Sequence, residues 1–499
     1  MNLPDHDSNN KSKRDFRIAI VGSGCTALKI ATLITKYAKS AEAQGLNLKI
    51  TLLESTHRVG GLLQTQRHLS GLKVEHAAQG VLASRTIFLE TLEELGLTPE
   101  DLIAPPKERQ LQTRFLINRS KNLVALRPSL LQLWKHGLLS PIAFLRILKD
   151  LLIGNELAPD PNETLYKFFE RHFGHAVAEN FILPFATGIW GGGAEQLLLR
   201  HAFPRLAELE IRYGSLLRGM LASALRGKQQ KNQLTGDALK HAWPQGLLSF
   251  PNGMHTLIEQ FSRVLQIDSR TASSAIQLKL TTPVQSIRKT EQGTLLLNDS
   301  LEFDTVFWTA TPWSSPQLKW NQKDSQREWD SLQSTPTHGL IVVNLAGPRS
   351  PATRDGFGAL APRSSDGLLG VLFVHSIYPQ HVPHNSYSYR ALLAGDRNPE
   401  MILWDDAKLR EYSLQELRTL KLIGENESPT HVDIVRWPRA IGIADRDHDA
   451  RMRALWRIQA EHPNVHFAGI YKKGVGVADA LQSGKDSFEE WLSGLRPSH

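Results

Sequence analysis

Cysteine is almost absent from this sequence, since Cys25 is the only one among 499 residues. A single cysteine excludes a disulfide within the chain, a Cys-x-x-Cys redox pair and a cysteine-based zinc site, and it fits a reducing, cytoplasmic compartment. No uninterrupted apolar run reaches the ~18 residues that indicate a membrane span. The first 14 residues are polar and of mixed charge, so we expect no secretory signal.

Nucleophile sets and metal-ligand clusters are scarce as well. No Ser/His/Asp or Cys/His arrangement stands out. His375, His381 and His384 lie within ten residues of one another, but no carboxylate or cysteine joins them and prolines separate them. We therefore expect a surface loop there and no metal site.

The charge balance is basic and locally concentrated. The net charge is +8, and residues 114 to 153 hold seven basic side chains against one acid, Asp150. Apolar residues interleave with these charges, a pattern found where a helix lies on an anionic membrane surface and equally on a solvated basic face. Nucleic-acid binding is disfavoured because no recognition module accompanies the charge.

The order of elements predicts an α/β fold. A short apolar strand at residues 16–22, a helix at 25–39 and a second strand at 48–54 form a βαβ unit. Residues 129–241 have helical periodicity and read as a helical insert, whereas most later segments alternate as strands. The chain is long enough for two to four domains.

The first strand ends in a glycine turn that matches G-x-G-x-x-[GA]. In such a turn Gly22 permits the tight bend, Gly24 lets a pyrophosphate approach the backbone, and Ala27 lets helix and strand pack closely. Glu54 ends the second strand, where a carboxylate can bind ribose hydroxyls. A glycine turn without a ligand is the alternative for this motif alone.

A second glycine pair follows at Arg58, Gly60 and Gly61. An NAD enzyme does not need this element. The pairing resembles FAD-dependent amine oxidases and related flavoproteins, in which the glycines and the arginine lie against the FAD pyrophosphate.

The helical insert resembles one branch of these flavoproteins, the protoporphyrinogen oxidase family. The resemblance is carried by residues 168–174, 181–192, 201–210, 214–219, 251–257, 369–373 and 467–477, and it covers roughly residues 16–492. It implies a Rossmann-like FAD-binding domain of the amine oxidase type, a mixed-sheet substrate domain and the α-helical insert. It also implies oxidation of a porphyrinogen in three two-electron steps, with molecular oxygen as the acceptor.

The resemblance further implies domain boundaries. The FAD-binding domain takes residues 1–104, 246–315 and 436–499, and the substrate domain takes 105–128 and 316–435. The insert, 129–245, is the candidate membrane-binding part. A homodimer stays open.

Site residues are implied position by position. FAD is expected to bind non-covalently, because no Cys or His in the segment 469–477 can tether it. The FAD-contacting positions are Gly22, Ser23, Gly24, Cys25, Thr26, Ala27, Glu54, Ser55, Arg58, Gly60, Gly61, Ala77, Ala78, Val284, Gly469, Val475, Gly476 and Val477. The substrate positions are Arg114, which would pair with a propionate, and Gly188, Leu360, Leu372 and Leu392, for whose leucines plain sheet core is the alternative.

The sequence departs from the family near the expected site. The family's Gly-Pro is Ala77-Ala78 here, a position usually aromatic is Leu392, and the family's Pro-Gln-Tyr is Gly442-Ile443-Ala444. Two other functions therefore stay open: oxidation of another substrate such as an amine or polyene, and a catalytically impaired paralogue that binds FAD or porphyrin.

Overall fold

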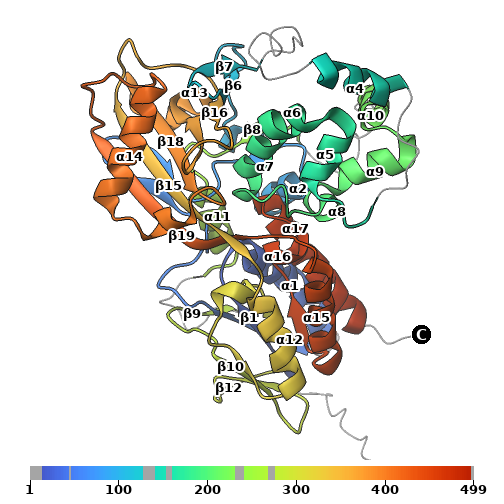
Figure 1. The fold of residues 1–499 in the computed structure, drawn as a ribbon. Helices are drawn as coiled ribbons and strands as arrows, with labels where there is room; N and C mark the ends of the chain where they lie inside the picture. Colours follow the sequence, from blue (N-terminus) through green and yellow to red (C-terminus); the bar gives the residue numbers. More distant parts are fainter. Residues whose placement is uncertain are drawn as a thin grey trace, which may run out of the picture.

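The structure is a computed structural model that describes residues 14–43, 46–126, 141–152, 160–230, 241–267 and 276–495. Figure 1 shows three parts: a parallel sheet with its helices at the base, a large twisted sheet above it, and a group of helices beside that large sheet. The fold class predicted from the sequence is confirmed.

The basal sheet carries the predicted βαβ unit. It has five strands in the order β20-β13-β1-β2-β9, all parallel. Their bounds are β1 (Arg14–Val21), β2 (Leu46–Leu53), β9 (Ile276–Lys279), β13 (Thr305–Trp308) and β20 (Val465–Phe467). Successive residues of β1 point to opposite faces, so Ile18 and Ile20 pack into one core while Ala19 and Val21 pack into another.

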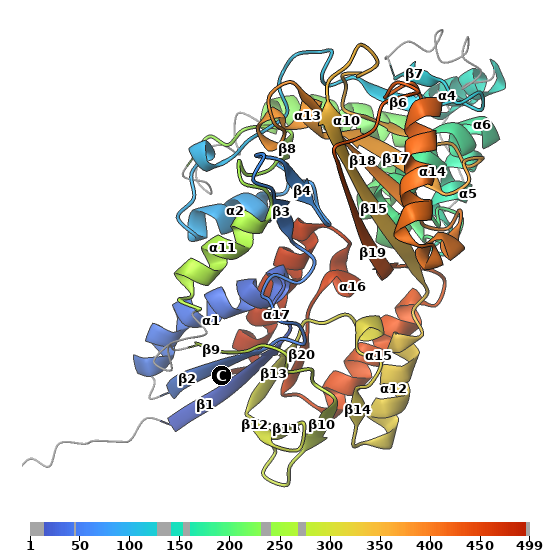
Figure 2. The same cartoon turned by 90° about the vertical axis from the view of Figure 1, so that its left-hand side faces the viewer.

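Helices cover both faces of this sheet. On the Ile18 face lie α1 (Cys25–Ala43), α17 (Val477–Leu495), α2 (Thr86–Glu94) and α11 (His255–Val264). On the Ala19 face lie α12 (Lys323–Gln333), α15 (His448–Glu461) and a small sheet of β10 (Ser286–Lys289), β11 (Leu295–Leu297), β12 (Leu301–Phe303) and β14 (Lys319–Trp320). Both layers are visible in Figure 2.

The upper sheet has seven strands in the order β19-β15-β18-β17-β16-β6-β7. Their bounds are β6 (Arg114–Ile117), β7 (Leu123–Ala125), β15 (Thr337–Pro348), β16 (Gly358–Leu360), β17 (Leu368–Phe373), β18 (Ser386–Ala394) and β19 (His431–Gly442). One face packs on α14 (Asp406–Thr419) in a continuous core. The other face is turned toward the glycine-rich segments, because β18 and β15 donate side-chain hydrogen bonds to the backbone of Ala77 and Glu75.

Two short antiparallel strand pairs and several single turns connect the longer elements. They are β3 (Thr65–Arg67) with β4 (Lys73–Glu75), β5 (Val81–Leu82) with β8 (Leu247–Leu248), α13 (Val374–Ile377), α16 (Ile470–Lys473), and the short helical turns η1 (Pro99–Asp101), η3 (Pro312–Ser314), η4 (Pro379–His381) and η5 (Pro399–Leu403). They bring residues 60–82 between the two large sheets.

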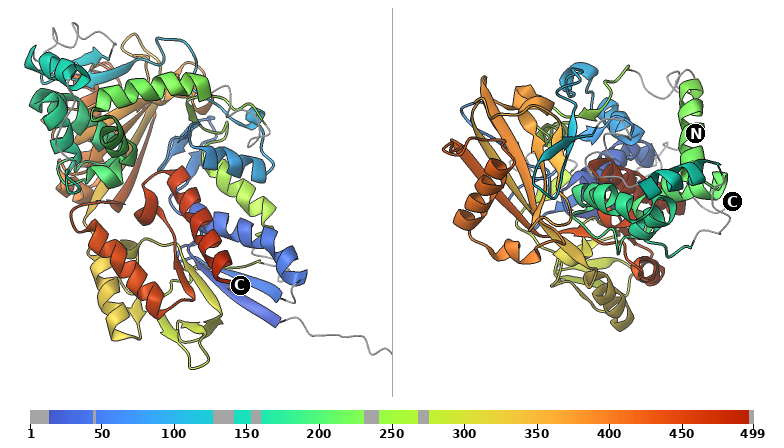
Figure 3. Two further views of the ribbon diagram at one scale, coloured as in Figure 1. Left: turned by 90° about the vertical axis from the view of Figure 1, so that its right-hand side faces the viewer. Right: turned by 45° about the horizontal axis from the view of Figure 1, so that its top comes forward.

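The described part of the insert is mostly helical. Its elements are α4 (Pro141–Leu152), α5 (Leu165–Phe173), α6 (His175–Val177), η2 (Ala178–Ile182), α7 (Leu183–Trp190), α8 (Leu199–Ala202), α9 (Pro204–Tyr213) and α10 (Leu216–Gln230). Figure 3 shows them gathered at one end of the molecule, beside the large sheet. None of the helices within the described ranges is long and apolar enough to cross a bilayer.

A buried ionic network holds the insert together. His172 of α5 contacts Asp150 of α4 at 2.5 Å and Glu210 of α9 at 3.0 Å. Arg171 bridges Glu210 and Glu163 at 2.7 and 2.6 Å. The network therefore links three helices through charges that lie largely out of solvent.

The domain boundaries implied by the resemblance stay a proposal. The boundary between residues 435 and 436 falls within β19, which pairs with β15 as far as Gly442. The boundary between 128 and 129 lies outside the described residues.

Candidate functional site

The glycine turn lies at the carboxyl end of β1, as predicted. Gly22 has φ +102°, and a Cβ there would stand 2.6 Å from Thr309 Oγ1. Gly24 and Gly61 are in close contact, because a Cβ on Gly61 would stand only 3.1 Å from Gly24 Cα. The two glycine segments, far apart in sequence, thus form one side-chain-free surface at the start of α1.

Backbone and side-chain hydrogen bonds fix this surface. Gly60 N donates to Ser23 O at 3.0 Å, and Gly22 N donates to Leu53 O at 2.8 Å. Glu54 is buried and accepts hydrogen bonds from Ser23 Oγ at 2.6 Å and from Thr56 N at 2.8 Å. The carboxylate is therefore held at the carboxyl edge of the sheet, beside the glycine turn.

Arg58 folds back on the second glycine pair. Its Nη2 donates to Gly61 O at 2.6 Å. Burial lowers the pKa of Arg58, and the neighbouring Glu54 carboxylate opposes that shift. The guanidinium thus supplies a cation that lies next to the glycine surface and stabilises its loop.

The C-terminal segment 469–480 lies beside the glycine surface, at the N-terminus of α1. Gly469 N donates to Ser483 Oγ at 2.8 Å, and Gly476 N donates to Asp479 Oδ2 at 3.0 Å immediately before α17 begins at Val477. Helices α1 and α17 cross closely near their N-termini, where Thr26 Oγ1 donates to Ala480 O at 3.0 Å. Val284 is buried beside the ends of β1 and β2.

These features fit the adenosine diphosphate part of FAD. The glycine surface leaves room for a pyrophosphate, the α1 N-terminus presents free N–H groups, and Glu54 offers a carboxylate to a ribose. Cys25 is buried in the first turn of α1, and burial raises the pKa of its thiol to about 12, so it is inert. The predicted cofactor residues of this turn and of 54–61 do lie together.

The predicted substrate residues share one face of the upper sheet. Pairing places Arg114, Gly358, Leu372 and Arg390 in one row across four strands. The next row holds Leu116, Leu360, Gly370 and Leu392. Directly paired residues point to the same side of a sheet, so all these side chains face away from α14.

Helix α7 closes on this apolar face. A Cβ on Gly188 would stand 2.9 Å from Leu360 Cδ2, so glycine is what permits the close approach. Leu360, Leu372 and Leu392 remain partly exposed, whereas most of their strand neighbours are buried. Arg114 is exposed at one end of its row, with its guanidinium carbon 4.8 Å from the Phe357 ring centroid. The five residues thus border one largely apolar surface, with the Arg114 guanidinium at its exposed end.

Sequence reasoning missed a polar group at the other end of that row. Arg390 is 3% exposed and donates from Nη1 to Gln79 Oε1 at 3.0 Å. Asn344, its partner in β15, donates to Asp433 Oδ2 at 3.2 Å. The sequence feature that could have revealed this group is an arginine within the mostly apolar segment 387–394.

A buried acid lies behind this group. Glu75 accepts hydrogen bonds from Met254 N at 2.7 Å and from Thr65 Oγ1 at 2.9 Å. Burial raises the pKa of Glu75 to about 7, although these hydrogen bonds and the Arg390 charge oppose the shift. Its carboxyl therefore changes protonation near neutral pH.

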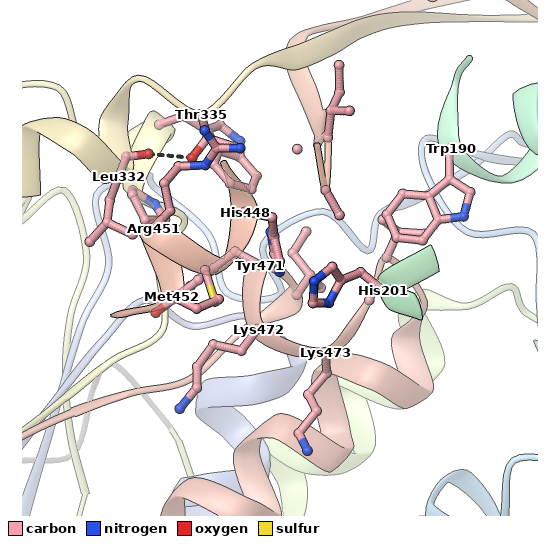
Figure 4. A pocket seen from close by; sticks show the side chains of 18 residues that line it. Trp190, His201, Leu332, Thr335, His448, Arg451, Met452, Tyr471, Lys472 and Lys473 are labelled. Carbon is pink, nitrogen blue, oxygen red and sulfur yellow. Dashed lines mark hydrogen bonds between the residues drawn. The ribbon is translucent and has the colours of Figure 1, made fainter. Parts of the chain in front are cut away.

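The altered segment 442–444 borders a small pocket, shown in Figure 4. A Cβ on Gly442 would stand 2.6 Å from Trp313 Cη2, so the tryptophan occupies the space of a larger residue. The pocket has a volume of ≈ 60 Å³, room for a few water molecules. His201 and His448 contact each other in its wall with ring centroids 4.5 Å apart, and burial lowers the pKa of His448 to about 4.

The expectation of a surface loop at His375 and His381 is wrong. His381 is fully buried and its Nε2 lies 2.8 Å from Phe250 O, while His375 is buried with Nδ1 3.0 Å from Ser388 O. Their partners are backbone carbonyls, which a sequence pattern does not reveal, and only His384 is exposed. Within the described ranges no three His, Cys, Asp or Glu side chains are grouped to hold a metal ion.

Sequence and structure comparisons place the chain among flavoproteins. Residues 37–487 match the family model of flavin containing amine oxidoreductases. Among curated proteins, the mitochondrial protoporphyrinogen oxidase of Nicotiana tabacum is 26% identical over 501 residues, with 96% of this chain and 95% of that protein covered. Coproporphyrinogen III oxidase of Bacillus subtilis is 25% identical over 496 residues, with 96% and 98% covered.

Solved structures agree on the fold. A crystal structure from Exiguobacterium sp. 255-15, with a provisional protoporphyrinogen oxidase assignment, gives a TM-score of 0.76 at 22% identity and covers 96% of this chain and 99% of that one. A putrescine oxidase gives a TM-score of 0.65 at 16% identity, covering 96% and 100%. The family match begins within α1, so it includes Gly60 and Gly61 but not the turn at Gly22. The close contact between Gly24 and Gly61 shows that this turn belongs to the same surface. The chain belongs to the flavin containing amine oxidoreductase family and is an FAD-dependent oxidoreductase.

Proposed function

We propose that this enzyme oxidises a porphyrinogen to a porphyrin, with molecular oxygen as the final electron acceptor. The observation that carries the proposal is the apolar sheet face of Leu360, Leu372 and Leu392, closed by Gly188 and ended by Arg114. A largely apolar macrocycle with carboxylate arms matches such a surface. The names of the relatives from Nicotiana tabacum and Bacillus subtilis support the same substrate class.

Each residue group has a distinct task in this mechanism. FAD, when bound, supplies the two-electron acceptor. The leucines exclude water and pack against the macrocycle, while Gly188 lets α7 approach without a side chain in between. Arg114 binds a propionate through its guanidinium fork and so fixes which methylene carbon is presented. Orientation of this kind is what a cofactor-bearing enzyme must add to the cofactor's own chemistry.

The residues proposed to hold FAD are the glycine surface with Ser23, Thr26 and Glu54, the Arg58 loop, and the segments around Ala77, Val284 and Val475. No protein nucleophile is proposed. Non-covalent attachment is part of the proposal, because the segment 469–477 has no Cys or His.

Anaerobic titration tests the substrate class directly. Protein loaded with FAD is mixed, without oxygen, with protoporphyrinogen, coproporphyrinogen, putrescine or a carotenoid-type polyene, and the visible absorbance of the flavin is followed. Bleaching by a porphyrinogen alone supports the proposal. Bleaching by the amine or the polyene alone would assign the other oxidase function. Porphyrinogen binding without bleaching would assign the impaired paralogue that the segment Gly442-Ile443-Ala444 leaves open.

Membrane association is a separate part of the proposal. Helix α4 exposes Ile142, Leu145 and Leu152 together with Arg146 and Lys149. This combination suits reversible attachment to an anionic surface from the cytoplasmic side. Other basic residues of the stretch 114–153, such as Arg127 and Lys135, lie outside the described residues.

A further inference from the structure

Arg390 is a buried guanidinium whose hydrogen bonds go to neutral acceptors. Nη1 donates to Gln79 Oε1 at 3.0 Å and Nη2 donates to Ala77 O. Its Nε has no hydrogen-bond partner within the part of the chain that the structure describes. Burial lowers the pKa of Arg390 to about 10, and the Glu75 charge opposes that shift. The side chain therefore stays charged at neutral pH and clamps the loop of residues 77–79 from the sheet side.

The clamp fixes the orientation of the Gln79 carboxamide. A guanidinium has donors and no acceptor, so only the amide oxygen can face it. Nε2 must then point elsewhere, and it is buried without a hydrogen-bond partner among the described residues. Gln79 as a whole is 7% exposed. A buried N–H without an acceptor is unfavourable, so this donor is expected to meet an acceptor in the working enzyme.

The position of the Gln79 Nε2 donor in the fold indicates which group could accept its hydrogen bond. Gln79 directly follows Ala77 and Ala78, two of the proposed FAD contacts. Arg390 pairs with Leu372 across the sheet and stands two residues from Leu392. The carboxamide therefore lies between the segment proposed to touch the flavin and the apolar face proposed to take the substrate.

We propose that Gln79 donates a hydrogen bond from Nε2 to a heteroatom of the flavin ring, and that Arg390 is the positioning residue that holds the carboxamide in this orientation. Negative charge on the ring heteroatoms grows when the flavin takes up electrons. A fixed donor there stabilises the reduced form more than the oxidised form. Gln79 thereby raises the reduction potential of the bound flavin.

A double-mutant cycle on the reduction potential tests this inference. The midpoint potential is measured against a redox dye for FAD-loaded wild type, Gln79→Met, Arg390→Met and the double variant. If each single change weakens the preference for reduced flavin tenfold, the potential falls by ~30 mV for a two-electron couple. Because Arg390 acts through Gln79, the double variant should fall no further than Gln79→Met.

Two further variants separate positioning from folding. Gln79→Glu keeps a partner for Arg390 but removes the donor, so the protein should fold and retain FAD, and a potential below that of Gln79→Met reports the added negative charge. Arg397 is a matched control, because among the residues that the structure describes its guanidinium donates hydrogen bonds to the backbone carbonyls of Ala361, Pro362 and Leu368 and to no side chain. Arg397→Met should leave the potential unchanged. If Arg390→Met does not fold, the midpoint potential of Gln79→Met tests the hydrogen bond to the flavin, and Gln79→Glu shows whether the loop folds without the amide donor.

A wild-type potential in Gln79→Met, or additive shifts in the double variant, would overturn the inference. It depends on the proposed flavin pocket and not on the proposed substrate. The dye titration uses no porphyrinogen, so failure of porphyrinogen oxidation would leave this result in place.

Discussion

Replacing Arg114 with alanine should impair substrate use while leaving the fold and the cofactor intact. The Arg114 side chain is exposed, and within the described ranges its one recorded contact is the Phe357 ring at 4.8 Å. An exposed cation–π contact contributes about 0.5–1 kcal/mol, and its loss leaves no buried partner unsatisfied. Removal of Arg114 should therefore change the free energy of unfolding by at most about 1 kcal/mol.

The effect on catalysis should be larger. A hydrogen bond to a charged group contributes about 1.5–3 kcal/mol, which is roughly a 10- to 150-fold change in an equilibrium constant. We expect Arg114→Ala to lower kcat/KM for a porphyrinogen by that factor. Arg114→Lys should recover only part of it, because an ammonium cannot form the two parallel hydrogen bonds of a guanidinium fork.

Steady-state kinetics on preparations of equal flavin content provide the assay. Arg119 is a matched control, because it is an exposed arginine in the turn between β6 and β7, and Arg119→Ala should behave as wild type. Wild-type kcat and KM in Arg114→Ala would refute the reasoning and assign Arg114 to the basic surface.

Four other predictions follow from the structure. Gly24→Val should abolish FAD binding, measured by the absorbance ratio of the purified protein, because a branched side chain would fill the surface shared with Gly61. Acid precipitation should release all the flavin into the supernatant; flavin left in the pellet would contradict non-covalent binding. Vesicles of anionic lipid should sediment the protein at low salt and release it at high salt, and equal binding to neutral vesicles would contradict the role of the basic residues. The helical insert should be most stable between about pH 4.5 and 6.5, because its buried ionic network needs His172 protonated and Glu210 ionised.

The pH dependence follows from the ionic network of the insert. Burial lowers the pKa of His172, but hydrogen bonds to Asp150 and Glu210 outweigh it, so the pKa of His172 is raised. Its contribution is present below the unfolded value and is lost as the pH rises through the raised value. Burial raises the pKa of Glu210, but hydrogen bonds from His172 and Arg171 lower it to about 2. That contribution is lost as the pH falls toward 2. Hydrogen exchange of α5 and α9, recorded from acid to alkaline pH with His172→Gln as the control, measures the loss of stability at both low and high pH.

Local patterns in the sequence were sufficient for the first part of the site. The turn at Gly22 and the strands and helix of the βαβ unit are each specified by hydrophobic pattern and glycine spacing within a single short segment. The resemblance then extended this to the insert and the apolar face. These elements were predicted because the interactions that define them are short-range.

The parts that were missed depend on pairing between distant strands. Arg390 reaches Gln79 across 311 residues, and only the register of β18 against β17 reveals that it shares a face with Leu372. The burial of His381 depends in the same way on a carbonyl 131 residues away. The residues around Arg390 do not show which distant strand pairs with β18, and the faces that paired side chains share follow only once that pairing is known.

Aerobic turnover tests the central claim most directly. FAD-loaded protein is incubated with protoporphyrinogen and with coproporphyrinogen, and porphyrin fluorescence is recorded together with oxygen uptake. Buffer and the Gly24→Val variant control for spontaneous oxidation. We expect at least one porphyrinogen to be converted much faster than in either control, with three oxygen molecules consumed for each porphyrin formed. Conversion of both porphyrinogens at the rate of the controls, by protein of full flavin content, would contradict it.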